Sequence, residues 1–110
     1  MSVPAAPARR AMARLIYRQA ARADLDAIYD FIAADSPERA ARFIESILER
    51  CERLEAFPES GPSRDAIRPG LRILPLPGRS VVAYRLDEDT VTVMRVFYGG
   101  QDYEALLTEE

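Results

Sequence analysis

The feature that most constrains the fold is a change of hydrophobic period near the middle of the chain. Before residue 58, apolar residues recur at the spacing of an amphipathic helix. After residue 70 they fall in short runs rich in β-branched and aromatic residues, as strands do. The intervening segment, PESGPSRDAIRPG at 58–70, holds three prolines and two glycines and is expected to be a loop. The sequence therefore predicts a helical half followed by a sheet, which is an α+β fold.

Two helices are predicted in the first half. The first spans 20–34 and has one apolar face, made by Leu25, Ile28, Tyr29 and Ile32. Ser36 suits the N-cap of a second helix and Pro37 its first position. The apolar stripe of this helix ends before Phe57 and Pro58, and its members are Ala40, Phe43, Ile44, Ile47, Leu48, Cys51 and Leu54. Because few residues separate them, the helices are expected to pair antiparallel.

Strands are predicted on both sides of the helical pair. They lie at 14–19, 71–76, 79–86 and 90–98. Turn residues separate the last three, which are therefore expected to form antiparallel hairpins. Pro75 has no N–H, so the strand that contains it should be short, bulged or at an edge. Asp102 is a suitable cap for a last short helix, YEALL.

The expected architecture is a strand, a helical hairpin and a three-stranded antiparallel meander, with the helices packed on one sheet face and the other face open. Strict alternation along 90–98 divides this strand between the two faces. One face receives Val91, Val93, Arg95 and Phe97, and the other receives Thr92, Met94, Val96 and Tyr98. The face that mixes an arginine with apolar groups is a plausible docking surface.

Length favours one domain, because 110 residues suit a single hydrophobic core. Residues 1–13 are rich in Ala, Pro and Arg and are expected to be a flexible leader, with Met12 as an alternative natural start. The domain proper is then 14–108. The chain has neither an apolar run long enough to span a bilayer nor the core of a signal peptide. We therefore expect a cytoplasmic protein that does not contact a membrane.

The types of residue present limit the catalytic and metal-binding sites that the chain can form. All 15 basic residues are arginine, with no lysine and no histidine, which excludes a His general base, a Ser–His–Asp triad, a Cys–His pair and a His-ligated metal. No metal or cofactor is expected. Cys51 lies on an apolar helical stripe and is interpreted as a core thiol, in preference to a reactive one. The formal net charge of −3 argues against strong direct binding of nucleic acid.

Positive charge is concentrated in residues 61–98, which hold six arginines against four acids. For Arg95, which has apolar neighbours, the alternatives are a partner contact, an internal salt bridge and, less favoured, catalysis. Arg72 either meets a carboxylate or phosphate of a partner or forms an ion pair with an acid such as Asp102. Arg79 and Arg85 alternate onto one strand face and would extend a positive patch with Arg95 if the registers agree.

The order and spacing of three segments resemble the ParE branch of the ParE/RelE superfamily of bacterial toxins, which includes plasmid-stabilisation toxins. The segments are AARADLDAIYDFIAADSPERAARFIESILERCERLEAFPESG, IRPGLRILPLPGRSVVAYRL and VTVMRVFYGGQDYE. The resemblance implies the toxin of a type II toxin–antitoxin system, bound by a ParD-like antitoxin whose extended C-terminal segment wraps the toxin. It also implies one of two targets, which are DNA gyrase for characterised ParE proteins and ribosome-bound mRNA for RelE-like ones.

We expect the antitoxin to contact Arg72, Arg79, Arg85 and Arg95. If the chain were instead an mRNA endonuclease, the candidate catalytic residues would be Arg72, Arg95, Tyr98 and Tyr103. Tyr98 stands where many relatives have a histidine, and arginine cannot transfer protons at neutral pH. The leading hypothesis is therefore a non-enzymatic gyrase inhibitor. An endonuclease is the runner-up, and an inactive module that only binds its antitoxin is the third reading.

Overall fold

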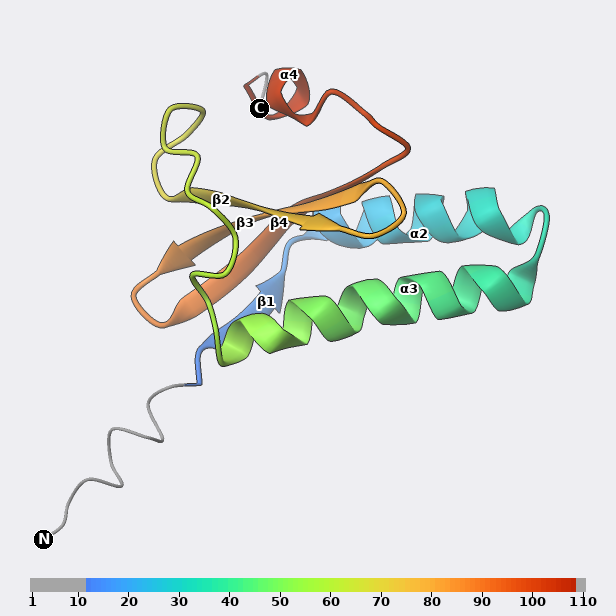
Figure 1. Ribbon diagram of the computed structural model, residues 1–110, viewed down its shortest axis with the longest axis horizontal. Coiled ribbons are helices and arrows are strands. Elements are labelled where there is room, and N and C mark those ends of the chain that lie inside the picture. The colour runs from blue at the N-terminus through green and yellow to red at the C-terminus, as the bar shows by residue number, and fades with distance from the viewer. Residues whose placement is uncertain (1–11, 109–110) are drawn as a thin grey trace, which may run out of the picture.

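The computed structural model describes residues 12–108, which form a helical hairpin, a four-stranded sheet and a short last helix (Figure 1). The helices are α2 (Gln19–Ala33), α3 (Pro37–Glu52) and α4 (Tyr103–Thr108), with a 3₁₀ turn, η1 (Arg53–Glu55), after α3. The strands are β1 (Arg14–Tyr17), β2 (Leu71–Leu76), β3 (Ser80–Asp87) and β4 (Thr90–Tyr98). The α+β fold and its order of elements are thus as predicted.

The helical hairpin begins and ends where local sequence signals place it. The Ser36 hydroxyl accepts a hydrogen bond from the Arg39 N–H at 3.2 Å, and Pro37 occupies the first turn of α3. The predicted first strand is shorter than expected, because α2 already starts at Gln19. Figure 1 shows α2 and α3 running antiparallel, with α2 nearer the strands and α3 below it, which confirms the predicted pairing.

The sheet is mixed, with strand order β1-β4-β3-β2. The last three strands form the predicted antiparallel meander, and β1 joins its edge by pairing parallel to β4. Pro75 lies in β2, which is an edge strand, as its missing N–H predicts. At the turn between β2 and β3, a Cβ on Gly78 would lie 2.8 Å from Cε1 of Phe43 in α3, so only glycine allows this close approach.

A β-bulge overturns the predicted division of β4 between the two faces. Ala83 pairs with Arg95 while the next residue of β3 pairs with Val93, so Met94 is an extra residue in β4. Val93 and Val96 consequently both pack on the helix side, while Met94 and Phe97 pack on the other side. The strict alternation predicted for this strand is therefore wrong beyond Met94, because the bulge shifts its phase by one residue.

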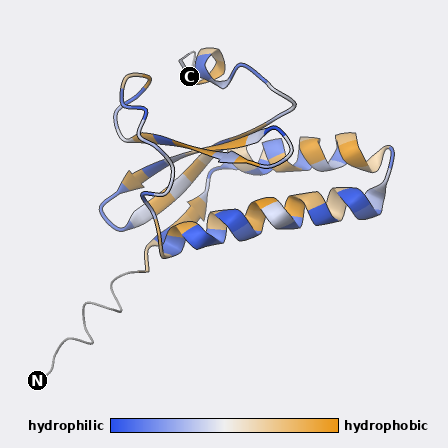
Figure 2. Ribbon diagram, in the orientation of Figure 1, coloured by the Kyte–Doolittle hydropathy of each residue, from blue (hydrophilic) through white to orange (hydrophobic). Residues whose placement is uncertain are grey.

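The sheet face that packs against α2 and α3, here called the helix face, carries the larger core. Its most buried members from the helices are Ala21, Ala40, Ile47, Cys51 and Leu54. Cys51 is completely buried, which confirms its interpretation as a core thiol. Figure 2 shows apolar residues along the strands, while α3 alternates between apolar and strongly polar residues, as an amphipathic helix does.

The opposite face, here called the far face, is not left open as the sequence predicted. Helix α4 and the loop that precedes β2 lie over it (Figure 1). They cover a second apolar cluster, which consists of Leu71, Ile73, Ala83, Met94, Phe97 and Leu107. Asp102 caps α4 as predicted, because its carboxylate accepts a hydrogen bond from the Ala105 N–H at 3.3 Å.

The start of the described chain bears on the predicted boundary between leader and domain. Ala13, which the prediction placed in the leader, is buried, and its N–H donates to the Glu55 carbonyl at 2.6 Å. Residues 1–11 of the predicted leader lie outside the described residues.

Within residues 12–108, no helix has the length and apolar character needed to cross a membrane.

Candidate functional site

Arg95 forms a two-point ion pair with Asp24 of α2. Its Nε and Nη2 donate to the two carboxylate oxygens at 2.7 and 3.0 Å, and both side chains are largely buried. The same carboxylate accepts a hydrogen bond from the Val96 N–H at 2.9 Å. This N–H lies in the part of β4 beyond the end of β1, so the carboxylate takes the place of a strand partner. The internal salt bridge that the sequence left open is therefore present, and it fastens α2 to the sheet.

Arg72 binds backbone carbonyls of the loop after η1, and not the carboxylate of an acidic residue. Its guanidinium donates to the carbonyls of Gly61 at 2.8 Å and Glu59 at 3.4 Å. The predicted alternative of an ion pair with Asp102 is wrong, because Asp102 caps α4 instead. Beside it, the Tyr84 hydroxyl donates to the Pro58 carbonyl at 2.7 Å and accepts the Gly61 N–H at 2.9 Å. Burial raises the pKa of Tyr84, so this hydroxyl stays protonated as a structural donor.

Arg79 and Arg85 lie near opposite ends of β3. Arg79 is in the turn before the strand, with φ of 59°, and donates to the Gly99 carbonyl at 3.3 Å. Arg85 reaches Asp87 at 3.4 Å, while its own Nε is buried with no hydrogen-bond partner in the described chain. Because six residues of strand extend over roughly 20 Å, these two arginines and Arg95 do not form one continuous patch.

The two tyrosines of the endonuclease alternative lie on different faces of the sheet. Tyr98 packs on the helix face, with ring centroids 5.3 Å from Phe43 and 6.1 Å from Phe31. Tyr103 lies on the far face beside Phe97, and its hydroxyl accepts a hydrogen bond from Arg64 at 3.1 Å. The structure therefore does not bring the proposed catalytic residues together.

Arg64 is a structural residue that the sequence gave no reason to select. Besides Tyr103, its guanidinium contacts the carboxylate of Glu104. Nearby, Arg68 donates to the Leu107 carbonyl at 3.3 Å. Both arginines come from the irregular loop before β2, and such a loop has no periodicity from which a contact can be predicted.

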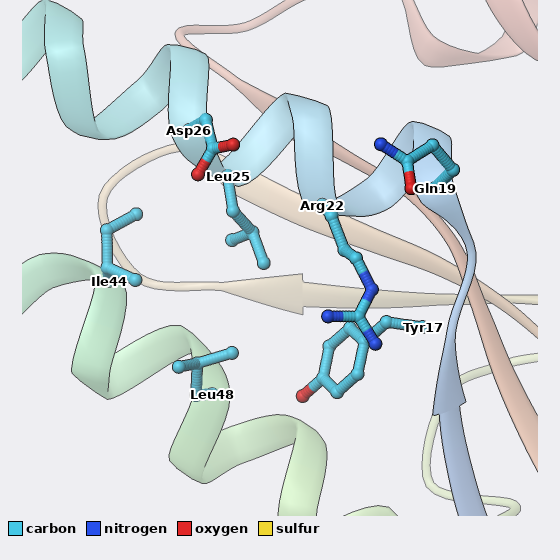
Figure 3. Close-up of a pocket in the computed structure, with 7 residues that line it drawn as sticks. All are labelled: Tyr17, Gln19, Arg22, Leu25, Asp26, Ile44 and Leu48. Atoms are coloured by element: carbon cyan, nitrogen blue, oxygen red, sulfur yellow. The ribbon is translucent and has the colours of Figure 1, made fainter.

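A hollow of about 470 Å³ opens between the two long helices at the end next to β1. This α2–α3 hollow is lined by Tyr17, Gln19, Arg22, Leu25, Asp26, Ile44 and Leu48 (Figure 3). Leu25, Ile44 and Leu48 were predicted to lie on the apolar faces of the two helices; in the structure they are half-buried and form the apolar floor of the hollow. The apolar stripes of both helices are wider than contact with the sheet requires, and this width is the signal that could have identified the hollow.

Charged groups stand on the α2 side of this hollow. Figure 3 shows the Arg22 guanidinium beside the Tyr17 ring, with Asp26 one turn further along α2. Burial raises the pKa of Tyr17, and it raises the pKa of the neighbouring Cys51 thiol to about 11. Neither group is therefore ionised near neutral pH, so the hollow offers an apolar surface with charges at its rim and no activated nucleophile.

Residues 12–108 contain no group of three or more His, Cys, Asp and Glu side chains that could hold a metal ion. The family model described as ParE toxin of type II toxin-antitoxin system, parDE, matches residues 15–103. The chain belongs to the ParE toxin family. Toxin ParE3 of Caulobacter vibrioides is 31% identical over 100 residues, which cover 87% of this chain and 96% of that protein.

A solved structure of the chromosomal ParDE TA system from P. aeruginosa contains a chain with 29% sequence identity and a TM-score of 0.68. The match covers 80% of this ParE-family chain and 97% of the solved one. The predicted resemblance is thus confirmed, and the chain is a ParE toxin of a type II toxin–antitoxin system, which implies an antitoxin as its partner. The family match includes the α2–α3 hollow and all four of the predicted antitoxin-binding arginines.

Proposed function

We propose that this ParE toxin acts in the cytoplasm as an inhibitor of DNA gyrase, works by protein contacts rather than by catalysis, and is neutralised by a ParD-like antitoxin. The proposal extends the family assignment to a target and to a kind of antitoxin. Phosphodiester cleavage by a ribose hydroxyl needs a proton acceptor, a proton donor and cations around one phosphate. The four residues best suited to these roles in this chain have other contacts.

The dispersal of those residues is the observation that carries the proposal. Tyr98 packs between aromatic rings on the helix face, while the Tyr103 hydroxyl is bonded on the far face. Arg72 holds the loop carbonyls and Arg95 holds Asp24. A single phosphate cannot contact both tyrosines, because the sheet lies between them. This arrangement favours contact-based inhibition over RNA cleavage.

For the antitoxin, we propose the α2–α3 hollow as the seat of an amphipathic segment. Leu25, Ile44 and Leu48 supply the apolar floor, and Arg22 and Asp26 supply charges at the rim. A partner segment with an apolar stripe and matching charges would remove this floor from water, which is the main source of affinity in such contacts. Among the arginines, Arg79 and Arg85 remain proposed antitoxin contacts outside the hollow, while Arg72 and Arg95 would act mainly by holding the toxin surface in shape.

The proposed target is tested with purified toxin in two parallel assays, gyrase supercoiling and cleavage of mRNA on ribosomes. We expect supercoiling to be blocked and message to remain intact, with the same result for Tyr98→Phe and Tyr103→Phe. Codon-specific cleavage that is lost in either tyrosine variant, without an effect on gyrase, would establish the endonuclease. A folded protein that is inert in both assays and does not inhibit growth would identify a module that only binds its antitoxin.

The antitoxin contact is tested with Leu48→Glu, which places a charge on the apolar floor of the hollow. The partner gene encoded beside the toxin gene would be co-expressed with each variant. We expect Leu48→Glu to remain folded and toxic but to lose neutralisation, because burying an unpaired carboxylate opposes binding. Glu49→Gln, on the neighbouring exposed position of α3, is the matched control and should be neutralised like the wild type.

A further inference from the structure

Phe57 is an exposed aromatic residue in the loop that follows η1. It is 65% exposed, although an aromatic side chain gains more from burial than most others. Its backbone is nevertheless fixed on both sides. The Phe57 N–H donates to the Arg53 carbonyl at 3.0 Å, and the Phe57 carbonyl accepts hydrogen bonds from the Ser60 hydroxyl at 2.7 Å and the Ser60 N–H at 3.1 Å. Phe57 is therefore a large apolar group presented at the surface by an ordered backbone.

The rest of this loop is fastened to the sheet. Arg72 and Tyr84, which belong to β2 and β3, bind the loop carbonyls as described above. At Gly61 a Cβ would lie 2.8 Å from the Ile73 carbonyl oxygen, so the loop backbone lies directly against β2. Figure 1 shows this loop passing from the end of α3 and η1 to the start of β2. A surface that is already ordered loses little conformational entropy when a partner binds, which favours Phe57 as a contact residue.

Beside Phe57, a groove runs between α3 and β2. Its first part is a hollow of about 180 Å³ with an apolar floor and arginines at its rim, lined by Arg50, Arg53, Leu54, Phe57, Ser60 and Leu74. Arg50 also lines a second hollow, of about 120 Å³, which extends along α3 as far as Leu76 and Pro77. The two hollows together are here called the α3–β2 groove. This groove lies on a different side of α3 from the α2–α3 hollow.

The two arginines of the groove have no partner within the described part of the chain. Arg50 is half-buried and Arg53 is exposed, and neither side chain forms a hydrogen bond or ion pair with any of residues 12–108. No described acidic residue lines the hollow that they share. A guanidinium binds a carboxylate in two-point geometry, and partial burial strengthens this contact. The rim of the groove is therefore suited to the carboxylates of a partner.

The surrounding charges indicate that this partner is a protein and not a nucleic acid. Acidic residues occur throughout the same stretch of the chain, at Glu49, Glu52, Glu55 and Glu59. A run of phosphates would lie close to these carboxylates and be repelled by them. A folded protein can instead place separate carboxylates opposite Arg50 and Arg53. Aromatic and arginine side chains are also the residues that protein interfaces favour.

We propose that Phe57, Arg50 and Arg53 form the surface by which the toxin contacts its gyrase target, with Phe57 in an apolar pocket of gyrase and the arginines paired with acidic residues around that pocket. This inference rests on the proposed function for the identity of the target. It gives the toxin two separate contact surfaces, because the antitoxin segment is proposed to occupy the α2–α3 hollow. Since both surfaces include α3, an antitoxin bound in the hollow stands in the way of gyrase.

The first test measures gyrase inhibition and gyrase affinity for the full-length toxin and for Phe57→Ala. Because Phe57 is largely outside the toxin's own core, we expect an unchanged thermal transition and a loss of about tenfold or more in both measurements. Phe31→Ala is the matched control. Phe31 is 71% exposed in α2, outside the groove, and its variant should inhibit gyrase like the wild type.

Arg50→Gln with Arg53→Gln tests the charge pairs. The double variant should weaken gyrase binding about tenfold, because each of the two charge pairs contributes modestly, and it should flatten the dependence of affinity on salt. Arg42→Gln, at an exposed position of α3 outside the groove, is the matched control and should keep the wild-type affinity and salt dependence. All of these variants should bind the antitoxin with unchanged affinity, which verifies that each is folded.

Gyrase inhibition at the wild-type level in Phe57→Ala, or in the arginine double variant, would overturn the inference and leave the proposed function intact. A loss of antitoxin affinity with inhibition retained would assign the surface to the antitoxin instead. A toxin dimer that Phe57→Ala dissociates, or binding to DNA without gyrase that the arginine variant abolishes, would assign it to a second copy or to nucleic acid, and either result would overturn the inference. A wild-type toxin with no effect on gyrase would refute the proposed target itself, and this assignment with it.

Discussion

The two faces of the sheet are covered in different ways. On the helix face, two long helices bury a continuous apolar core. On the far face, a helix of six residues and an irregular loop cover a smaller cluster, and arginines of the loop hold that helix through polar contacts. The first cover is stabilised mainly by burial of apolar surface, whereas the second depends also on individual hydrogen bonds and one exposed ion pair.

Because of this difference, the two faces are expected to differ in local stability. Cooperative units with few buried contacts open at a lower free energy than the rest of a domain. We therefore expect the helix face to set the global stability of the toxin and the far face to open locally. The helix hairpin can then present the hollow as a fixed surface to a partner, because its floor is part of the stable unit.

The largest effect should come from Ile47→Ala, on the helix face. Ile47 is fully buried in the main core, and we expect a loss of about 4 kcal/mol in the free energy of unfolding. Leu107→Ala, at an equally buried site of the far face, should cost only about 1 kcal/mol globally, because α4 can detach while the rest stays folded. Urea denaturation of both variants measures the contrast, and equal losses would show that the two faces unfold as one unit.

The next largest effect is expected from Asp24→Ala, at the junction of α2 and β4. The change leaves the largely buried Arg95 without its carboxylate and the Val96 N–H without an acceptor, so we expect a loss of about 3 kcal/mol. Asp26→Ala, at the rim of the hollow, is the control and should change stability by less than about 0.5 kcal/mol. If the two variants were equally stable, Arg95 would be available to a partner as the sequence first suggested.

Alkaline pH should weaken the helix face specifically. Burial raises the pKa of the Cys51 thiol from its ordinary value of 9.0 to about 11, so the unfolded state loses this proton first as pH rises. The stabilisation is complete below pH 9 and should fall by about 2 kcal/mol by pH 11. Tyr17 and Tyr84, whose pKa values burial also raises, contribute to the same loss as the pH approaches 10, so only the comparison with Cys51→Ala isolates the thiol. Unfolding curves of wild type and Cys51→Ala between pH 8 and 10 provide the measurement, and an equal slope in both would exclude the thiol as the cause.

Sequence reasoning was strongest where periodicity and local capping decide the structure. Ser36, Pro37 and the apolar stripes placed the helices, and Pro75 correctly indicated an edge strand. These signals are local, so they survive in the fold whatever packs around them. The same reasoning placed Leu48 on the apolar stripe of the second helix, but a stripe shows only that a side chain is apolar and not whether another element covers it.

The failures arose where long-range contacts decide the structure. The bulge at Met94 depends on how β3 and β4 pair, and the cover of the far face depends on Arg64 and Arg68 reaching across from a loop. Neither has a periodic signal. The partner of Arg95 was equally out of reach, since Asp24 is 71 residues away in sequence and was one of several acids on an amphipathic helix.

The smallest effect is expected from Arg64→Ala, and it tests the far face most directly. The substitution removes the contacts to Tyr103 and Glu104 but leaves Leu107 buried, so the midpoint of urea unfolding should stay unchanged. Amide exchange in α4 should nevertheless accelerate several-fold, because the helix opens by itself once its tether is lost. Arg39→Ala, which removes an exposed pair with Asp35, is the matched control and should leave exchange in α4 as it was. Unchanged exchange in Arg64→Ala would mean that apolar burial alone holds α4, and the contrast between the two faces would then be one of size and not of kind.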